Sequence, residues 1–374
     1  MKSMASTTGT EIRMNDFLAE ELPLRRQMLA AVDEVLHSGR YILGKEVEAF
    51  EREWANLCET QFCVGVGNGM DAIELSLRTL NIGPDDEVIT TPVTAFATVL
   101  AIMRAGATPV LADIDPDTAM LNPESIRRCL TSKTKAILLV HLYGQIGPVD
   151  ELGKVAKDRN IHIIEDCAQA HGARHNGKPA GSWGSFGAWS FYPTKNLGAI
   201  GDAGAVTTSS VEFASKVRSL RHYGQTGLHR HQLLGLNSRL DEVQAAILRV
   251  RMPYLTTWTE RRRNIAKQYH QRIKHPQVRL LAAPDEAERH VYHLFVITCP
   301  QRPELRDHLK SHGVESLIHY PIPAHKQEPC QWLPHDPFGL KHAEQHAEEC
   351  VSLPCHPGLS DGDVEKVVHA VNCF

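Results

Sequence analysis

The chain has 374 residues, of which 42% are hydrophobic and 22% charged, and its formal net charge at pH 7 is −4. These values are typical of a globular protein with room for two domains and large cores. The balance is slightly acidic and the basic residues are scattered, so nothing suggests nucleic-acid binding. No apolar run approaches the ~18 residues that a membrane-spanning helix needs.

The N-terminus and the cysteines exclude several further classes of protein. Residues 1–10 are rich in Ser and Thr and lack the apolar core of a signal peptide, so we expect a flexible tail over residues 1–14. Nine cysteines, an odd number without a CxxC pair, support neither a disulfide framework nor a zinc site. The histidine pairs 229/231 and 342/346 lack a Cys or carboxylate partner, and exposed positions explain them better than a metal does. We therefore expect a cytoplasmic protein without a metal.

Helical spacing of apolar residues predicts a first helix from Asn15 to Leu36 and a second over residues 44–57. A strand, a glycine turn and a helix follow over residues 63–75. Backbone N–H groups at the start of that helix, together with the helix dipole, form an anion site suited to a phosphate. The turn is not a dinucleotide fingerprint, because GVGNG lacks the third glycine at the required offset.

The next hundred residues alternate between strand and helix patterns. Strands are predicted at 86–92, 108–113, 135–142 and 162–166, and helices at 94–104, 123–130 and 149–158. This alternation predicts a mostly parallel sheet with helices on both faces and right-handed crossovers.

The strand at residues 162–166 ends in Glu165 and Asp166. Ligands of α/β sheets bind beyond the carboxyl ends of the strands, so Asp166 is placed to reach a pocket. A carboxylate there is a natural partner for a pyridinium nitrogen. The alternative is that Asp166 caps the turn that follows, a role that Asp fills well.

Lys195 lies at the tip of a turn after a second apolar strand pattern, which covers residues 185–191. Aromatic and apolar neighbours such as Trp189, Tyr192 and Leu197 would partly desolvate it. Desolvation lowers the pKa of a lysine and makes the neutral amine available to form a Schiff base. An ordinary loop lysine is the alternative.

A long basic helix over residues 254–273 leads into the C-terminal third of the chain. We predict a division into a tail, a large domain and a small domain, over residues 1–14, 15–255 and 256–374. The small domain is predicted to contain strands at 292–298 and 314–319 and helices at 303–312, 342–350 and 361–372.

Three long motifs carry a resemblance to a known family: EDCAQAHGA from Glu165, GSFGAWSFYPTKNLGAIGDAGAV from Gly184, and LNSRLDEVQAAIL from Leu236. They resemble the DegT-type nucleotide-sugar aminotransferases, which depend on pyridoxal 5′-phosphate (PLP) and belong to the fold-type I aminotransferases. The resemblance extends from about Tyr41 to the C-terminus. It implies an α/β fold, in which a large domain with a mostly parallel seven-stranded sheet carries a smaller C-terminal α+β domain.

The resemblance also implies roles for individual residues. Lys195 would hold PLP as an internal aldimine and later carry the proton, and Asp166 would keep the pyridine nitrogen protonated. Gln169 would reach the phenolic oxygen of the cofactor. The phosphate would be bound by Gly69, Met70 and Ser190, and by Asn237 of a loop that the family sends into its partner's active site. A homodimer with shared active sites follows.

The substrate pocket is expected near Tyr41, Tyr320 and His325, again by resemblance. One position departs from the family, because Ala95 stands where an aromatic residue usually stacks on the cofactor ring, and Phe96 is its neighbour. Either the alignment is one residue off or the ring is covered differently, and Phe96 could also be a core residue.

The implied reaction is a ping-pong transamination in which L-glutamate donates an amino group to a nucleotide-linked keto sugar. Lys195 itself argues against the related sugar dehydratases, which have histidine at this position. The segments 64–71, 141–145 and 237–242 look more like members that act at C-3 of dTDP-3-keto-6-deoxyhexoses. A C-4 keto sugar, a keto-cyclitol and a PLP-binding regulatory protein remain as alternatives.

Overall fold

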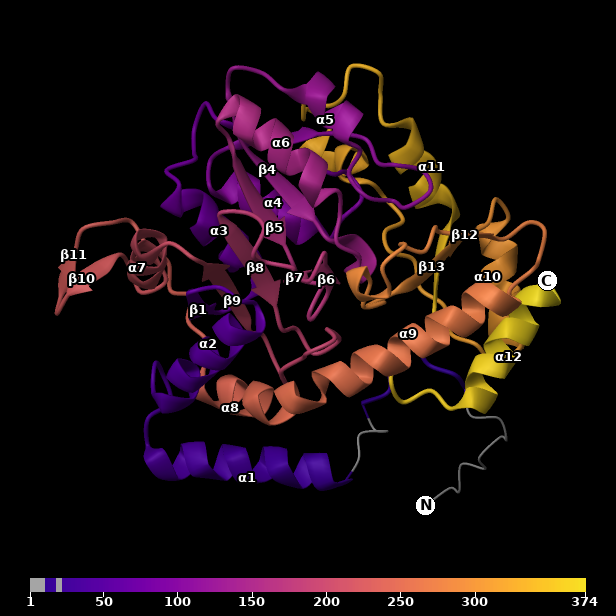
Figure 1. The fold of residues 1–374 in the computed structure, drawn as a ribbon, viewed down its shortest axis with the longest axis horizontal. Helices are drawn as coiled ribbons and strands as arrows, with labels where there is room; N and C mark the ends of the chain where they lie inside the picture. Colours follow the sequence, from indigo (N-terminus) through magenta and orange to yellow (C-terminus); the bar gives the residue numbers. More distant parts are fainter. Residues whose placement is uncertain (1–10, 18–21) are drawn as a thin grey trace.

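The computed structural model describes residues 11–17 and 22–374 of the chain (Figure 1). Residues 1–10 of the predicted tail lie outside the described residues, as do residues 18–21 of the first predicted helix. Helix α1 covers Leu22–Ser38, so its described start is later than the predicted Asn15. Within the rest of the predicted tail, Ile12 is buried and pairs with Val314 in an isolated β-bridge.

A seven-stranded sheet forms the centre of the molecule, in the order β1-β9-β8-β5-β4-β2-β3. Strand β9 runs antiparallel to both of its neighbours, β1 and β8, and the other neighbouring strands pair in parallel. The mostly parallel sheet predicted from the sequence is confirmed. The strands are short and almost wholly buried, as sheets covered on both faces require. Their bounds are β1 Phe62–Val66, β2 Glu87–Thr90, β3 Thr108–Leu111, β4 Thr134–Val140, β5 His162–Asp166, β8 Phe186–Ser190 and β9 Gly204–Thr208.

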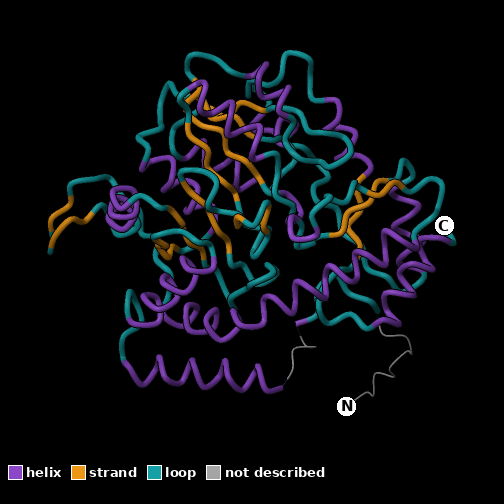
Figure 2. The backbone as a smooth tube through the Cα atoms, viewed as in Figure 1, coloured by secondary structure: helices purple, strands orange, loops and turns teal. Residues whose placement is uncertain are grey.

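Helices cover both faces of this sheet (Figure 2). They are α2 Lys45–Leu57, α3 Gly69–Thr79, α4 Phe96–Arg104, α5 Pro123–Cys129, α6 Val149–Arg159 and α7 Val211–Leu220. Two short hairpins complete this part, β6–β7 at Arg174–His175 and Lys178–Pro179, and β10–β11 at Gln225–Gly227 and Arg230–His231.

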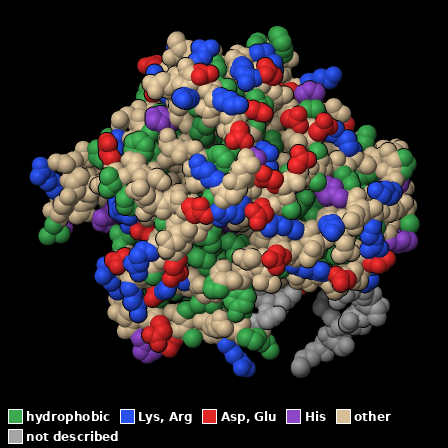
Figure 3. Space-filling model, in the orientation of Figure 1, with side chains coloured by type: hydrophobic (Ala, Val, Ile, Leu, Met, Phe, Trp, Pro, Cys, Tyr) green, Lys and Arg blue, Asp and Glu red, His purple; other side chains and the backbone are tan. Residues whose placement is uncertain are grey.

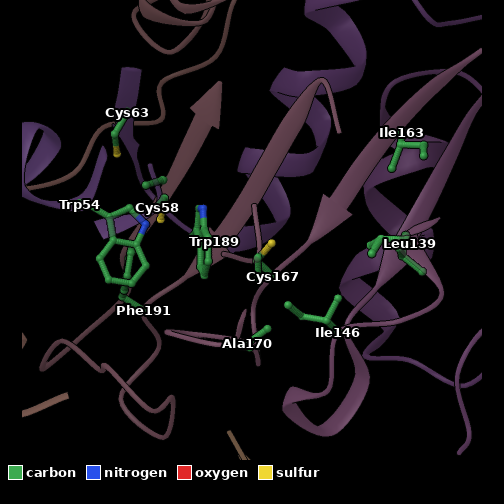
Figure 4. Packing of buried hydrophobic residues seen from close by; sticks show 14 of the residues in the cluster. Trp54, Cys58, Cys63, Leu139, Ile146, Ile163, Cys167, Ala170, Trp189 and Phe191 are labelled. Atoms are coloured by element: carbon green, nitrogen blue, oxygen red, sulfur yellow. The ribbon is translucent and has the colours of Figure 1, made fainter. Parts of the chain in front are cut away.

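Aromatic side chains pack tightly under the strand that leads to Lys195 (Figure 4). The ring of Trp54 meets those of Trp189 and Phe191 edge-on, with centroids 4.9 and 5.1 Å apart. All three side chains are fully buried. Such packing stabilises a rigid base for the loop that carries Lys195.

Helix α8, Glu242–Arg251, passes through a short 3-10 turn into the long helix α9, Leu255–Arg272. Figure 1 shows α9 running from the large sheet to a second, three-stranded sheet. This C-terminal sheet is antiparallel and consists of β12 Arg279–Leu280, β13 Phe295–Thr298 and β14 Cys350–Leu353. It shares a separate core with α9, α10 Arg302–Ser311 and α12 Asp361–Asn372, while α11 Lys341–Glu349 precedes β14.

Two details of the C-terminal prediction are wrong. The predicted strand at 314–319 contains only isolated bridges, from Val314 to Ile12 and from Leu317 to Ser352. The predicted helix at 342–350 ends one residue too late, because Cys350 is the first residue of strand β14. This strand was not predicted, since its four residues are too few for a periodic signal. The exact domain boundary at 255/256 stays a prediction.

All nine cysteines are free thiols, and only Cys373 is exposed. Among the described residues, no helix combines the length and the apolar character needed to cross a membrane.

Candidate active site

Asp166 and the Lys195 turn leave the same edge of the large sheet, because β5 and β8 are parallel neighbours. Asp166 is the last residue of β5 and is buried. Its Oδ2 atom accepts a hydrogen bond from Thr98 Oγ1 at 2.8 Å, and Oδ1 accepts one from the backbone N–H of Ala168 at 3.1 Å. A turn follows at residues 168–169, and the hydrogen bond from Ala168 caps it, so Asp166 also fills the alternative capping role.

The Lys195 side chain is partly buried, and its turn is closed by a hydrogen bond from its N–H to the carbonyl of Tyr192 at 2.8 Å. Burial lowers the pKa of Lys195 to about 8, while the charge of Asp166 opposes this shift. A lysine on a solvated loop would keep its ordinary pKa. Lys195 therefore has a substantial neutral fraction at mildly alkaline pH, as nucleophilic and proton-carrying amines require.

Three histidines that the sequence analysis did not single out lie close enough to Lys195 to interact with its charge: His171, His293 and His319. Burial and then the positive charge of Lys195 lower the pKa of each, to about 3 for His171, to about 4 for His319 and well below the usual value for His293. All three are therefore neutral near pH 7. They therefore add no positive charge near the amine.

Asn196, the residue after Lys195, connects the lysine turn to the segment that enters the C-terminal sheet. Its side-chain N–H donates to the carbonyl of Val291 at 3.1 Å, and its Oδ1 atom lies 3.1 Å from His293 Nδ1. Asn196 is buried. The backbone beside Lys195 is thus fixed from the C-terminal part of the chain.

The predicted phosphate residues Gly69 and Ser190 lie side by side. Gly69 is the first residue of α3, and the side chain of Asn68 caps this helix by accepting from the N–H of Asp71 at 2.8 Å. A Cβ atom at Gly69 would lie 2.6 Å from Ser190 Cβ, so only glycine fits. The free N–H groups of the helix start and the hydroxyl of Ser190 together suit a phosphate. The neighbouring Met70 is partly buried, with its sulfur 3.8 Å from Arg104 Nη1.

Gln169 connects the lysine edge of the sheet to Tyr320. Its Oε1 atom accepts from the N–H of Tyr143 at 2.5 Å, and its Nε2 donates to the Tyr320 hydroxyl at 3.2 Å. Burial, followed by the charge of Asp166, raises the pKa of Tyr320 to about 12, so Tyr320 stays protonated. By contrast, His325 contacts Glu344, with Nε2 2.9 Å from the carboxylate.

Tyr41 and Asn237 lie at the protein surface, beside the start of α8. The carbonyl of Tyr41 accepts from the N–H of Glu242 at 3.1 Å, and its side chain is half exposed. Asn237 is exposed, and its neighbour Ser238 accepts from the N–H of Gly67, two residues before Gly69. Neither has a described contact with Lys195 in the same chain, and their roles at a shared site stay predictions.

Ala95 and Phe96 form the start of α4, one turn before Thr98. Ala95 precedes the helix without a side-chain cap, and Phe96 is 37% exposed. Phe96 is therefore not a core residue, and its stacking on the cofactor stays a prediction. The contact between Thr98 and Asp166 was missed because no sequence pattern joins two residues on different elements.

One group of potential metal ligands occurs among the described residues: His141, Glu165 and Cys167. Glu165 is fully buried and accepts hydrogen bonds from the N–H groups of Gly181, Trp183 and Gly184 at 2.7 to 2.8 Å, and His141 Nε2 lies 2.9 Å away. Because its oxygens already have these partners, Glu165 anchors the loop and is a poor metal ligand.

Several known proteins are similar to this chain over nearly its whole length. The model of the DegT/DnrJ/EryC1/StrS aminotransferase family matches residues 23–372. The chain is 45% identical to a dTDP-3-amino-3,6-dideoxy-alpha-D-galactopyranose transaminase of Aneurinibacillus thermoaerophilus, over 94% of this chain and 96% of that protein. It is 41% identical to a "pleiotropic regulatory protein" of Geobacillus stearothermophilus, over 97% and 98%. Its fold is similar to the crystal structure of DesV from S. venezuelae, with a TM-score of 0.93, 42% identity and coverage of 97% and 98%.

Proposed function

Because the chain belongs to the DegT/DnrJ/EryC1/StrS aminotransferase family and is a PLP-dependent sugar aminotransferase, we propose that it transfers the amino group of L-glutamate to a nucleotide-linked keto sugar. The observation that carries this proposal is the pair of Asp166 and a Lys195 with a lowered pKa at one edge of the sheet. Direct contact between Gly69 and Ser190 supports the site for the phosphate.

The residues present fit PLP. Lys195 would hold it covalently, Asp166 would contact its pyridine nitrogen, and Gln169 its phenolic oxygen. Gly69, Met70 and Ser190 would bind its phosphate, with Asn237 of the partner subunit completing the site. When bound, PLP supplies an electron sink that stabilises negative charge at the α-carbon of the amino donor.

The side chains of this protein then have separate tasks. Asp166, which Thr98 and Ala168 orient, would keep the proton on the pyridine nitrogen. The amine of Lys195 would accept the proton from the α-carbon of the donor and return it in the second half of the transfer. The lowered pKa values of His171, His293 and His319 keep these imidazoles uncharged near pH 7 and make them weak bases. The amine of Lys195 is therefore the stronger base.

For the acceptor we propose a dTDP-linked 3-keto-6-deoxyhexose. The name of the Aneurinibacillus relative, a 3-amino sugar transaminase, supports position C-3. A C-4 keto sugar or a keto-cyclitol is the alternative within the same chemistry. The regulatory name of the Geobacillus relative favours a second candidate, a PLP-binding regulator without turnover. The lowered pKa of Lys195 argues against this candidate, because a regulator does not need a reactive amine.

The experiment that separates enzyme from regulator is a half-reaction with the PLP-loaded protein and L-glutamate, without an acceptor. We expect the visible absorption band of the bound cofactor to disappear and one equivalent of 2-oxoglutarate per site to form. A band that persists with no 2-oxoglutarate would falsify the glutamate transaminase proposal. A panel of dTDP-linked 3-keto and 4-keto sugars and UDP-linked 3-keto sugars then identifies the acceptor by return of the band.

A further inference from the structure

The short turn Leu142–Gly144 follows strand β4 and lies against Gln169. The backbone of Tyr143 is in the left-handed region there, with φ 60° and ψ 1°. Bulky residues seldom adopt this conformation, because the Cβ atom crowds the backbone. A Cβ atom at the next residue, Gly144, would lie 2.8 Å from the carbonyl oxygen of Gln169, so the turn packs tightly on that residue. Strained turns persist only where their surroundings hold them, and they cluster at functional sites.

The backbone of Tyr143 places its N–H group against the side chain of Gln169. This N–H donates to Gln169 Oε1 at 2.5 Å. Because a backbone N–H needs an acceptor, the bond fixes which end of the amide is the oxygen. Nε2 of Gln169 carries two N–H groups, and one of them donates to the Tyr320 hydroxyl at 3.2 Å. The second N–H can then donate to the phenolic oxygen of the cofactor.

The side chain of Tyr143 is held by the C-terminal part of the chain. Its hydroxyl contacts the carbonyl of His319 and lies 2.8 Å from His346 Nε2. A phenol has one proton and a carbonyl can only accept it, so Nε2 of His346 is the donor in the second bond. Burial raises the pKa of Tyr143 well above its usual value and lowers that of His346 to about 4. Both groups are therefore uncharged near pH 7.

The backbone and the side chain of Tyr143 act on the same pair of residues. His319, whose carbonyl Tyr143 holds, directly precedes Tyr320, and the Tyr320 hydroxyl accepts from Gln169. Figure 3 shows acidic and basic side chains scattered over the surface, whereas burial keeps His319 and His346 in this network uncharged. Salt screens interactions between exposed charges, so the effect of Tyr143 should not depend on ionic strength.

We propose that Tyr143 is a positioning residue for the cofactor site. Its left-handed turn presents an N–H to Gln169, and its hydroxyl holds the segment that carries Tyr320. The amide of Gln169 is thereby fixed between partners from distant parts of the chain. This inference rests on the proposed function, because it assigns Gln169 to the phenolic oxygen of PLP. The competing explanation is a purely structural role in the core, which predicts lower stability without any change at the cofactor.

The test compares Tyr143→Phe with the control Tyr269→Phe. Each variant removes only the hydroxyl of a fully buried ring, and the Tyr269 hydroxyl donates to the carbonyl of Pro354 at 2.7 Å in the C-terminal core. The visible absorbance of the PLP-loaded proteins is titrated with pH at low and at high salt. The glutamate half-reaction and the melting temperature of the protein without cofactor are measured in parallel.

We expect Tyr143→Phe to raise the pH midpoint of the cofactor band by about 0.5 unit or more. The N–H of Gln169 stabilises negative charge on the phenolic oxygen, and a less well fixed amide stabilises it less. Glutamate conversion should slow by about five-fold or more. Tyr269→Phe should lower the melting temperature as much as Tyr143→Phe does and leave the midpoint unchanged. In a Gln169→Leu background, Tyr143→Phe should cause no further shift, because the amide through which it acts is gone.

Several results would overturn this inference. An unchanged midpoint in Tyr143→Phe would do so, as would an equal shift in Tyr269→Phe. A shift that persists in full in the Gln169→Leu background, or that disappears at high salt, would show that Tyr143 acts by another route.

A second variant serves if Tyr143→Phe does not fold. His346→Leu removes the donor to the Tyr143 hydroxyl and should shift the midpoint less, in the same direction; no shift would reject the positioning role. The proposed function is tested separately by the wild-type protein. If that protein fails to convert glutamate while the variants show the expected shifts, the amino donor is rejected and the role of Tyr143 stands.

Discussion

The lowered pKa of Lys195 leads to a pH prediction for the protein without cofactor. Only the neutral amine attacks the aldehyde of PLP, so the rate of covalent capture should rise with pH and level off above about 8. The charge of Asp166 raises the pKa of Lys195, and its removal in Asp166→Asn should therefore move the midpoint to lower pH. Stopped-flow absorbance across pH 6 to 10 measures both, and a midpoint near 10 would contradict the burial of this amine.

Replacement of Lys195 by alanine should abolish covalent retention of PLP after borohydride reduction and slow the glutamate half-reaction by about 1,000-fold. The matched control is Lys45→Ala, which removes an exposed lysine at the start of α2. Mass spectrometry and absorbance check the two effects. Turnover that survives in Lys195→Ala would mean that another group carries the proton.

Thr98 is expected to position Asp166. Thr98→Val removes the donor to Asp166 Oδ2 and leaves that oxygen without its partner. We expect kcat to fall about ten-fold while KM for glutamate changes little, because the carboxylate loses its orientation toward the pyridine nitrogen. The control Thr90→Val removes a buried hydroxyl whose acceptor is the carbonyl of Leu138 on β4. Equal losses of kcat in both variants would indicate a general effect on stability.

Helix α3 begins at Gly69, which lies against Ser190. A methyl group at Gly69 would meet Ser190 Cβ at 2.6 Å and push the helix start away from the hydroxyl. Gly69→Ala should therefore weaken PLP binding by about ten-fold or more, as measured by titration of the apoprotein. Gly153→Ala in α6 is the matched control, because a Cβ there meets nothing within 4 Å. It should leave PLP affinity unchanged and slightly raise the melting temperature.

The elements also explain which parts of the site could be predicted from sequence. Asp166, Gly69 and Lys195 follow short local patterns, in which a buried strand or a glycine turn comes directly before the functional residue. His293 and His319 reach Lys195 from about a hundred residues further along the chain. No periodicity or spacing in the sequence indicates that these histidines lie near Lys195. Strand β14 was missed for a related reason, since its partner β13 lies far away in sequence and defines it.

For the whole molecule, we predict a homodimer built on helix α1. This helix packs on α8 through Leu24 and Val35, and it leaves Leu22, Leu29 and Leu36 more than half exposed at intervals of seven residues. In Figure 1, α1 is the outermost element at the lower edge. An exposed apolar stripe of this kind marks an interface.

Leu29→Glu places a charge in that stripe and should convert the dimer to monomers, as measured by light scattering after size exclusion. The monomer should bind PLP more weakly than the wild type, because Asn237 of the partner subunit would be lost from the site. Phe338→Glu is the control, since Phe338 is exposed but adjoins α11 at the opposite side of the molecule. A monomeric wild-type protein with full activity would disprove the shared site.

The attachment of Asn196 to Val291 and His293 has a consequence for protein engineering. Exchange of the C-terminal part between relatives is an obvious route to a new acceptor sugar. In this protein, such a chimera would also replace the groups that fix the backbone beside Lys195 and two of the imidazoles around its amine. A junction placed at the start of α9 would therefore alter catalysis together with specificity. Residues 291–293 and 319 need to be kept with the lysine turn if the two properties are to be changed separately.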